Sequence, residues 1–225
     1  MYAENRLTHN WLMKKAINDK VRERLPHLAG LVLDLGCGTR PFEADILAHA
    51  SRYLGVDWGN TLHGSHADIV ADLNQSLPLD DESADHVVSF EVMEHLAEPR
   101  MMLAEAFRIL RRGGQLTLSV PFQWWVHEEP WDYYRYTRHG LEYLLKRAGF
   151  TDIRVAPSTG FWSMWFLKLN YQTTRLVRGP HHVKLLVRAA LIPFWWINQS
   201  LAPVMDRWWP EDRETAGYFV TAAKP

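Results

Sequence analysis

Short apolar runs that suit buried strands alternate with helix-forming segments along most of this chain. Because parallel strands need long crossover connections, this alternation predicts an α/β fold with a doubly wound, Rossmann-like and mostly parallel sheet. Seven strands are expected, with a helical insertion before the last: LVLDL (31–35), YLGVD (53–57), IVADL (69–73), DHVVSF (85–90), QLTLSVP (115–121), DIRVA (152–156) and GYFVTAA (217–223). Helices are expected over 9–25, over 44–50, from Pro99 to a stop at Gly113-Gly114, and over 138–149.

The composition fits a single domain over residues 1–225, in which residues 1–30 form an N-terminal helical extension. The chain has 225 residues, of which 47% are hydrophobic and 23% charged, so it can bury a large core. Cys37 is the only cysteine, which excludes a disulfide framework and any multi-cysteine zinc site. Charged residues interrupt the first 20 positions, so no secretion signal is predicted and a cytoplasmic location is expected.

A glycine-rich turn follows the first expected strand. Gly36 and Gly38 lack a Cβ atom, so the backbone there can turn sharply and approach a ligand closely. Asp57 ends the second strand, where an acid can accept hydrogen bonds from both hydroxyls of a ribose. Pro41 stands in the turn, and the third glycine of a dinucleotide-binding turn is absent. Asp34 would repel phosphates and suits a cationic ligand, with a loop or cap role as its alternative.

Several motifs occur together in a fixed order: LDLGCGTRPF, VDW, ADL, SADHVVSFEVMEHL, ILRRGGQLTLSVPF and GYFVTAAKP. In order and spacing they resemble class I S-adenosylmethionine-dependent methyltransferases. The resemblance is to the broad small-molecule type (methyltransferase type 11), which includes quinone-biosynthesis methyltransferases. It covers about residues 31–157 and 216–225, and it implies S-adenosylmethionine (S-adenosyl-L-methionine) as the cofactor.

The resemblance also implies which residues surround that cofactor. They are Asp34, Gly36, Cys37, Gly38, Asp57, Trp58, Asp72, Leu73, Phe90 and Glu91. Asp34 would lie near the ammonium group, Asp57 would hold the ribose hydroxyls and Trp58 would lie against the adenine. Asp72 and the Leu73 backbone would meet the adenine amine. Without the resemblance, Trp58 could be ordinary core and Asp72 could cap a turn.

The segment PFQWWVHEEPWDYYRYTRHG, after the fifth expected strand, holds many titratable side chains among tryptophans. In the resembling fold this loop borders the acceptor pocket. The expected catalytic residues are His127, Glu128 and Tyr134, and the expected substrate contacts are His95, Trp131, Tyr133 and Arg135. His127 is the best general base, since an unperturbed histidine titrates near neutrality. The alternative is a loop held by aromatic packing and surface ion pairs. No metal site is predicted, because the histidines are not grouped with carboxylates at ligand spacing.

Residues 158–215 form a long connection with a composition of its own. Between positions 158 and 209 there are six basic residues, one acid and six of the 11 tryptophans. Prolines and amides interrupt the longest uncharged stretch, 189–205, so a membrane span is not predicted. Tryptophan beside Lys and Arg is typical of segments that lie in a membrane interface, and the cations favour an anionic leaflet. A helical lid or a homodimer surface would bury the same apolar residues and is the alternative.

Together these features predict an enzyme that transfers a methyl group from S-adenosylmethionine to an acceptor, with oxygen as the expected atom. The acceptor would be small or lipid-linked, such as a glycan or another hydrophobic metabolite, and the enzyme would associate peripherally with the anionic inner face of the membrane. One alternative is an NAD-dependent oxidoreductase, which Pro41 and Asp34 disfavour. Another is a catalytically silent protein that keeps the cofactor fold and docks a membrane or partner. Nucleic acid is not an expected partner, because the basic residues are interleaved with apolar ones.

Overall fold

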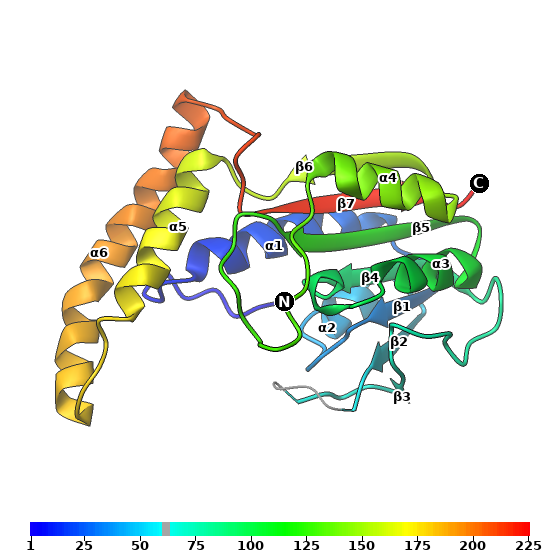
Figure 1. Cartoon of the computed structure of the whole chain (residues 1–225), viewed down its shortest axis with the longest axis horizontal. Coiled ribbons are helices and arrows are strands. Elements are labelled where there is room, and N and C mark those ends of the chain that lie inside the picture. Colours follow the sequence, from blue (N-terminus) through cyan, green and yellow to red (C-terminus); the bar gives the residue numbers. More distant parts are fainter. Residues whose placement is uncertain (60–63) are drawn as a thin grey trace. The chain divides into compact units, whose positions relative to one another are not determined.

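The computed structural model describes residues 1–59 and 64–225, and these residues divide into two compact units. Unit 1 comprises Met1, Val21–Ala156 and Gly217–Pro225, and unit 2 comprises Tyr2–Lys20 and Pro157–Ala216. The long connection expected over 158–215 therefore forms a unit together with the beginning of the chain. The strands belong to unit 1 except for the last residue of β6, and helices α5 and α6 belong to unit 2 (Figure 1).

Unit 1 is built on one seven-stranded sheet in the order β3-β2-β1-β4-β5-β7-β6. The strands are β1 (Leu31–Leu35), β2 (Arg52–Asp57), β3 (Ile69–Val70), β4 (Ala84–Phe90), β5 (Leu110–Pro121), β6 (Thr151–Pro157) and β7 (Gly217–Ala223). Strands β1 to β5 pair in parallel, and β7 runs antiparallel to β5. The prediction of a doubly wound, mostly parallel sheet is confirmed. Its strand order reverses between β1 and β4, which is where ligands bind in such sheets.

Helices connect the parallel strands of unit 1. They are α2 (Glu43–Leu47), α3 (Pro99–Ile109) and α4 (Arg138–Ala148), and the short 3-10 turn η2 (Met93–His95) comes before α3. A second 3-10 turn, η1 (Leu25–His27), precedes β1. Helix α1 (Trp11–Arg24) begins in unit 2 and ends in unit 1. Leu33, Val87 and Leu116 of the sheet form one buried cluster with Met102 of α3 and Leu141 of α4. The burial of these apolar side chains is the main stabilising contribution to unit 1.

The glycine pair 113–114 does not stop the preceding helix, contrary to the expectation. Helix α3 ends at Ile109 because Leu110 is already extended, and β5 begins there. Gly113 has a φ of 76° and lies where the register between β4 and β5 shifts. A Cβ atom at Gly114 would stand 2.9 Å from the carbonyl oxygen of Asp85. The glycines therefore permit an irregularity within a strand pair, which is a common use of glycine in sheets.

The third strand is also shorter than expected, because β3 ends at Val70. Asp72 lies in a turn, where its Oδ1 accepts hydrogen bonds from the backbone and side-chain amides of Asn74. Such a local hydrogen bond competes with strand pairing. Asp72 therefore caps this turn, which was the alternative interpretation of this residue.

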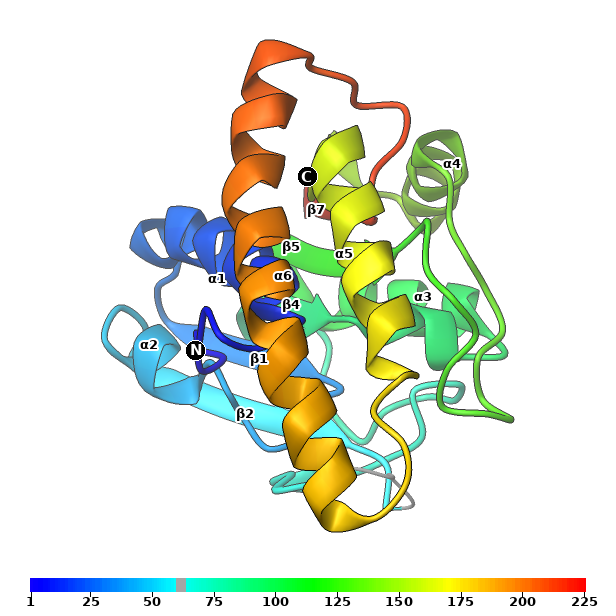
Figure 2. The same ribbon diagram turned by 90° about the vertical axis from the view of Figure 1, so that its left-hand side faces the viewer.

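Unit 2 contains the helices α5 (Phe161–Thr174) and α6 (His181–Trp208), which lie side by side (Figure 2). Polar side chains are buried between its elements. The amide of Asn198 donates to Oδ1 of Asn170 over 2.8 Å, and the Trp195 indole donates to Oγ1 of Thr173 over 2.8 Å. Gln199 accepts from the backbone amide of Leu12, over 3.0 Å. These hydrogen bonds satisfy groups that would be costly to bury unpaired.

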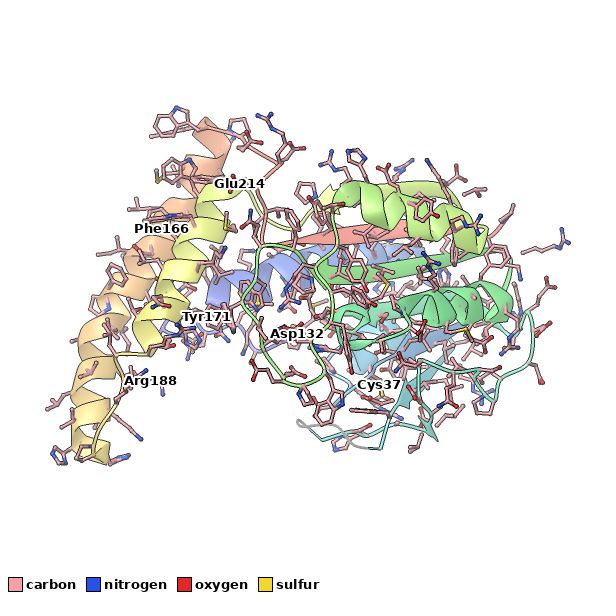
Figure 3. The ribbon with its side chains drawn as sticks, viewed as in Figure 1. Cys37, Asp132, Phe166, Tyr171, Arg188 and Glu214 are labelled. Carbon is pink, nitrogen blue, oxygen red and sulfur yellow. The ribbon has the colours of Figure 1, made fainter. Side chains whose placement is uncertain are left out.

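The exposed side of α6 is apolar instead. Ile197, Leu201, Val204 and Trp208 recur at intervals of four, three and four residues, and each is 43% or more exposed. This spacing places them on one face of the helix. Figure 3 shows the side chains along both helices, with Phe166 on α5 and Arg188 on α6. Among the described residues, no helix is both long and apolar enough to cross a membrane.

The carboxylate of Asp206, a residue far away in the sequence, caps the N-terminus of helix α5. Its carboxylate oxygens accept hydrogen bonds from the backbone amides of Trp162 and Ser163, over 2.8 and 3.1 Å. An acid at a helix N-terminus stabilises it by about 0.5–2 kcal/mol.

We expect Asp206→Ala to lower the free energy of unfolding, measured by urea denaturation, by about 1–2 kcal/mol. The exposed Asp80, in the connection before β4, is the control, and Asp80→Ala should change this value by less than about 0.5 kcal/mol. Equal effects of the two substitutions would contradict the capping role.

Candidate active site

The glycine-rich turn follows β1 at the carboxyl edge of the sheet. Gly36 and Gly38 have φ values of 80° and 50°, in the left-handed region that favours glycine. A Cβ atom on Gly36 would lie 2.3 Å from a methyl carbon of Val92, in the segment after β4. A Cβ atom on Gly38 would meet no described atom within 4 Å. Gly36 thus allows close packing across the switch point, and Gly38 presents backbone that a ligand can approach.

Asp57 links this turn to the end of β2. Its Oδ2 accepts a hydrogen bond from the amide of Gly38 over 2.7 Å, and its Oδ1 accepts from the amide of Trp58 over 2.8 Å. Burial raises the pKa of Asp57, against the effect of these hydrogen bonds. The Ser65 side chain is a third donor to this carboxylate. Each carboxylate oxygen can accept about two hydrogen bonds, so capacity for a further hydroxyl donor remains.

The buried carboxylate of Asp34 is hydrogen-bonded to a tyrosine on β2. The hydroxyl of Tyr53 donates to its Oδ2 over 2.5 Å, and the residue is only 3% exposed. Burial raises the pKa of Asp34 to about 7. Arg40 is held by Asp68, with 2.6 Å between its Nη2 and the carboxylate. The partner Tyr53 could not be predicted from the sequence, because a strand residue 19 positions away becomes a neighbour only through the pairing of β1 with β2.

Cys37 lies in the same turn (Figure 3) and is buried. Burial raises the pKa of its thiol to about 12. A thiol in this state carries almost no thiolate at neutral pH, so it is not a nucleophile. The sulfur packs against β2 at Gly55, where a Cβ atom would lie 2.8 Å from it, so position 55 has no room for a side chain.

The remaining expected cofactor contacts lie around the turn. The Trp58 ring meets that of Trp131 edge to face, with 5.3 Å between their centroids. Phe90, at the end of β4, contacts Phe42 at a centroid distance of 5.0 Å. Leu73 is buried in the core. Glu91 has a φ of 55° and accepts a hydrogen bond from the Ser119 hydroxyl over 2.7 Å. Burial raises the pKa of Glu91 to about 7.

These features fit S-adenosylmethionine. The open backbone at Gly38 and the carboxylate of Asp57 suit a ribose, and the acids Asp34 and Glu91 suit a ligand with positive charge. Aromatic rings at Trp58 and Phe90 offer apolar faces. A pyrophosphate would meet carboxylates at this edge, which is unfavourable for a dinucleotide.

Arg135, an expected substrate contact, is engaged within its own loop. Its guanidinium makes two hydrogen bonds to Asp132, of 2.6 and 2.7 Å, and a further one to the carbonyl oxygen of Trp125. Burial of Asp132 opposes its ionisation. The hydrogen bonds from Arg135 and from the His127 amide outweigh this effect and lower the pKa of Asp132 to about 2. The bidentate ion pair therefore fixes the loop after β5, and sequence reasoning did not single out Asp132.

The expected catalytic residues are only partly brought together. The rings of His95 and His127 are 5.0 Å apart, and Oε2 of Glu128 lies 3.8 Å from Nε2 of His95. Burial lowers the pKa of His127, so its imidazole is neutral at pH 7. Tyr134 differs: its hydroxyl donates to the Ala97 carbonyl over 3.2 Å and its ring is half-exposed. Tyr133 is half-exposed as well, and its amide donates to the carbonyl oxygen of Glu94.

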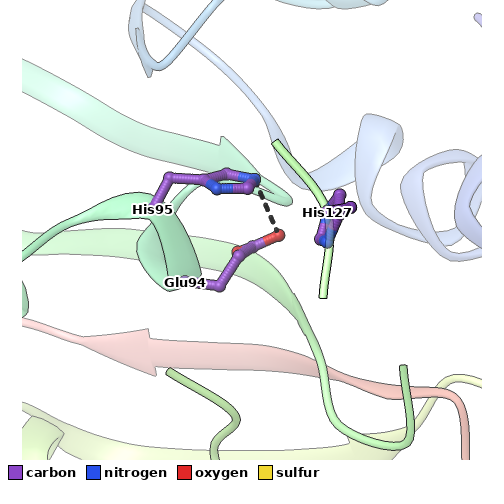
Figure 4. Close-up of side chains that lie close together, drawn as sticks. All are labelled: Glu94, His95 and His127. Carbon is purple, nitrogen blue, oxygen red and sulfur yellow. Dashed lines mark ion pairs between the residues drawn. The ribbon is translucent and has the colours of Figure 1, made fainter. Parts of the chain in front are cut away.

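The structure also corrects the expectation that histidines and carboxylates stand apart. Glu94, His95 and His127 offer ligand atoms that all lie within 4.8 Å of one another (Figure 4). Glu94 is completely buried and was missed by sequence reasoning. The pairing of β4 with β5 brings the segments after both strands to the same edge, and so joins residues 32 positions apart. The signal available in the sequence was the Glu-His pair of EVMEHL.

The pKa of Asp34 makes the stability of the ligand-free protein depend on pH. Between about pH 4 and pH 7 the folded state holds a proton on Asp34 that the unfolded state has lost, so the free energy of unfolding falls as pH rises. One such group contributes a slope of up to about 1.4 kcal/mol per pH unit. We expect Asp34→Asn, which keeps an acceptor for Tyr53, to reduce this slope in urea denaturation between pH 5 and pH 8. Tyr53→Phe should move the decline to higher pH, because the hydrogen bond that it removes lowers the pKa. An unchanged slope in Asp34→Asn would contradict the assignment.

Comparisons with known proteins agree with this geometry. Residues 33–118 match the family described as "Methyltransferase domain". A probable S-adenosylmethionine-dependent methyltransferase of Mycolicibacterium smegmatis is 37% identical over 113 residues, which cover 46% of this chain and 44% of that protein. A ubiquinone biosynthesis O-methyltransferase of Pseudomonas fluorescens is 27% identical over 179 residues, which cover 71% and 69% of the two chains.

The fold is shared with phosphoethanolamine N-methyltransferase 2 of Haemonchus contortus, solved with phosphomonomethylethanolamine and S-adenosylhomocysteine. The TM-score is 0.58 at 17% identity, and the likeness covers 96% of this chain and 56% of that one. This chain thus spans about half of the length of the Haemonchus contortus protein and less than half of the length of the Mycolicibacterium smegmatis relative. None of these similarities favours an NAD-dependent oxidoreductase. With the sheet order and the glycine-rich turn, they show that the chain carries a class I S-adenosylmethionine-dependent methyltransferase domain, with S-adenosylmethionine as its cofactor.

Proposed function

We propose that this chain transfers the methyl group of S-adenosylmethionine to an oxygen atom of a small, hydrophobic or lipid-linked acceptor. The observation that carries the proposal is the open turn at Gly38, tied to Asp57 at the switch point of the sheet. Oxygen as the acceptor atom is supported by the name of the Pseudomonas fluorescens relative, an O-methyltransferase. The remaining acceptor chemistry is inferred from the aromatic loop after β5 and from unit 2.

The cofactor contacts in this proposal are those given by the resemblance. Asp57 accepts hydrogen bonds from the ribose hydroxyls, and Asp34 and Glu91 supply negative charge toward the ammonium and sulfonium groups. Asp72 and the Leu73 backbone meet the adenine amine, while Trp58 contacts its face. When bound, S-adenosylmethionine supplies an electrophilic methyl group on a sulfonium that leaves as a neutral thioether.

The task of the chain in such a reaction is to align the acceptor and to remove its proton. Alignment of two reactants can lower a barrier by about 7–11 kcal/mol. Trp131 and Tyr133 belong to the loop after β5 and supply apolar surface. His95, His127 and Glu128 lie together, and each can accept or hold a proton of an acceptor hydroxyl. Tyr134 and Arg135 hold the loop in place through the contacts described above.

Binding of the product S-adenosylhomocysteine tests the cofactor site. We expect isothermal calorimetry to show binding of S-adenosylhomocysteine by the full chain and no binding of NADH. Asp57→Ala should weaken this binding at least tenfold, because it removes a charged acceptor for the ribose hydroxyls, worth about 1.5–3 kcal/mol per hydrogen bond. Asp80→Ala is the matched control and should leave the affinity unchanged.

Binding of NADH alone would overturn the proposal. Binding of S-adenosylhomocysteine without incorporation of labelled methyl groups into either soluble metabolites or lipid extracts would favour a protein that has kept the cofactor fold without turnover. Incorporation into the lipid fraction only would support a lipid-linked acceptor.

We also propose that unit 2 places the enzyme on an anionic membrane surface. Apolar side chains are exposed along α6 and beside it, namely Trp165, Leu176, Leu185, Leu186, Trp196, Ile197, Leu201, Val204, Trp208 and Trp209. Six basic residues and one acid accompany them between positions 158 and 209. Each basic residue near an anionic leaflet contributes about 1 kcal/mol of attraction. The occupant that matches both the apolar stripe and its cations is therefore a lipid surface of negative charge.

Cosedimentation with liposomes tests this surface. Trp195 is 1% exposed and hydrogen-bonded inside unit 2, so it must be left intact. We expect the full chain to bind phosphatidylglycerol vesicles and not phosphatidylcholine vesicles at low salt, and the triple substitution of Trp196, Trp208 and Trp209 by Ser to abolish this binding. Tyr143→Ser, at an exposed aromatic of α4, is the control and should bind as the unchanged chain does. Loss of binding in the control, or no binding by the unchanged chain, would overturn the proposal.

A further inference from the structure

Glu94, His95 and His127 form a compact cluster at the carboxyl edge of the sheet. Glu94 and His95 belong to η2, directly after β4, and His127 lies in the loop after β5. The three ligand atoms lie within 4.8 Å of one another, and Oε1 of Glu94 is 3.7 Å from Nε2 of His95 (Figure 4). Two imidazoles and one carboxylate are therefore directed into one small volume.

The carboxylate of this cluster lacks hydrogen-bond partners. Glu94 is 0% exposed, and neither of its side-chain oxygens has a partner among the residues that the structure describes. Buried carboxylates are normally hydrogen-bonded, paired with a charge or bound to a metal ion, because an isolated one is costly. The charge of Arg135 favours the ionised form of Glu94, but Arg135 makes no hydrogen bond to it, since both of its Nη atoms are bound to Asp132.

His95 is oriented as metal-bound histidines are, and His127 has a carboxylate beside its second ring nitrogen. Nδ1 of His95 lies 2.8 Å from the carbonyl oxygen of Trp131, to which it can only donate, so Nε2 carries the lone pair that faces Glu94. Nδ1 of His127 lies 3.3 Å from Oδ2 of Asp132 and also 3.3 Å from Nη2 of Arg135, and of these two atoms only the carboxylate oxygen can accept a hydrogen bond. Histidine ligands typically donate their second ring N–H to a backbone carbonyl or a carboxylate, which fixes the ring and raises its basicity. The second partner of His95 is thus in place, and for His127 it is Asp132 in the tautomer that carries the proton on Nδ1.

We propose that Glu94, His95 and His127 bind one divalent transition-metal ion, with Zn²⁺ as the reference ion. Imidazole and carboxylate ligands suit Zn²⁺ and its first-row neighbours, and a site with three protein ligands leaves a position open for substrate. Donor atoms around tetrahedral Zn²⁺ stand about 3.4 Å apart, so the side chains close by roughly 1 Å when the ion binds. Oε2 of Glu128, 3.8 Å from Nε2 of His95, lies beside the site and outside this set of three.

The site gives the proposed methyl transfer a specific chemistry, and this step rests on the proposed function. An acceptor hydroxyl bound at the open position would have a lowered pKa, as metal-bound water does. Its proton passes to the carboxylate of Glu128 and then to solvent. The new bond joins the acceptor oxygen to the methyl carbon, and the bond from that carbon to sulfur breaks with its electron pair left on sulfur. His127, as a ligand, then positions the acceptor and is not the base.

Metal binding can be measured without any acceptor. The full chain, without an affinity tag and stripped with a chelator, is titrated with Zn²⁺ by equilibrium dialysis and with Co²⁺ by visible absorption. We expect one ion per chain with a dissociation constant in the micromolar range or below. Glu94→Gln, His95→Asn and His127→Asn should each weaken binding at least tenfold and alter the Co²⁺ bands. The double substitution of the exposed pair His181 and His182 by Asn is the matched control and should change neither.

Affinity for S-adenosylhomocysteine separates loss of the site from loss of the fold. A variant that loses Zn²⁺ and keeps this affinity supports the inference. No stoichiometric Zn²⁺ binding by the unchanged chain, or binding lost in the His181 and His182 control and kept in the three variants, overturns it. Zn²⁺ binding without methyl transfer leaves the metal site standing and contradicts the proposed function. Methyl transfer at full rate by the chelated chain overturns the catalytic role of the ion.

Discussion

The hydrogen bonds that Asp57 accepts from the amides of Gly38 and Trp58 join the turn after β1 to the end of β2. On the other side of β1, Gly36 packs so closely against Val92 that no side chain fits between them. The turn is thereby fixed between two strand ends at the point where the strand order reverses. Every other site residue in unit 1 is placed relative to this turn, because the parallel strands all end at the same edge.

Much of this fold was predictable from the sequence, because strands and helices follow from local patterns. The order of apolar runs, Pro99 at a helix start and Gly149 at a helix end were all interpreted correctly. The errors arose where a local pattern has two meanings. A glycine pair such as 113–114 can end a helix or permit an irregularity within a strand. Only the pairing of β4 with β5 decides between these two structures.

The site was predictable in part for a related reason. Residues next to strand ends, such as Asp57, Phe90 and Glu91, have a position that topology alone fixes. Their partners do not, since the Tyr53 hydroxyl and the Asp132 carboxylate reach their targets across strands and loops. Burial was equally invisible: nothing in EVMEHL distinguishes an exposed glutamate from one with no solvent contact. A search for carboxylates and histidines that follow neighbouring parallel strands would have found the cluster at Glu94.

The titratable groups at the carboxyl edge of the sheet together favour the binding of a cation. Burial raises the pKa of Asp34, Glu91 and Glu94, while the nearby cations Arg40 and Arg135 are already bound by other carboxylates. The edge therefore holds negative charge, or protons in its place, and gains free energy when a cation arrives. A sulfonium ligand and a divalent metal ion both meet this requirement, and a phosphate does not.

Unit 2 buries amide side chains among the apolar residues of its interior and carries an apolar stripe on its outside. The contact of α5 with α6 is specified by directional bonds such as that from Asn198 to Asn170, and the side chains at 197, 201, 204 and 208 take no part in these bonds. Substitutions of these four exposed residues therefore leave the hydrogen bonds between α5 and α6 intact. Natural variation can therefore change the apolar character of this face at little risk to the fold.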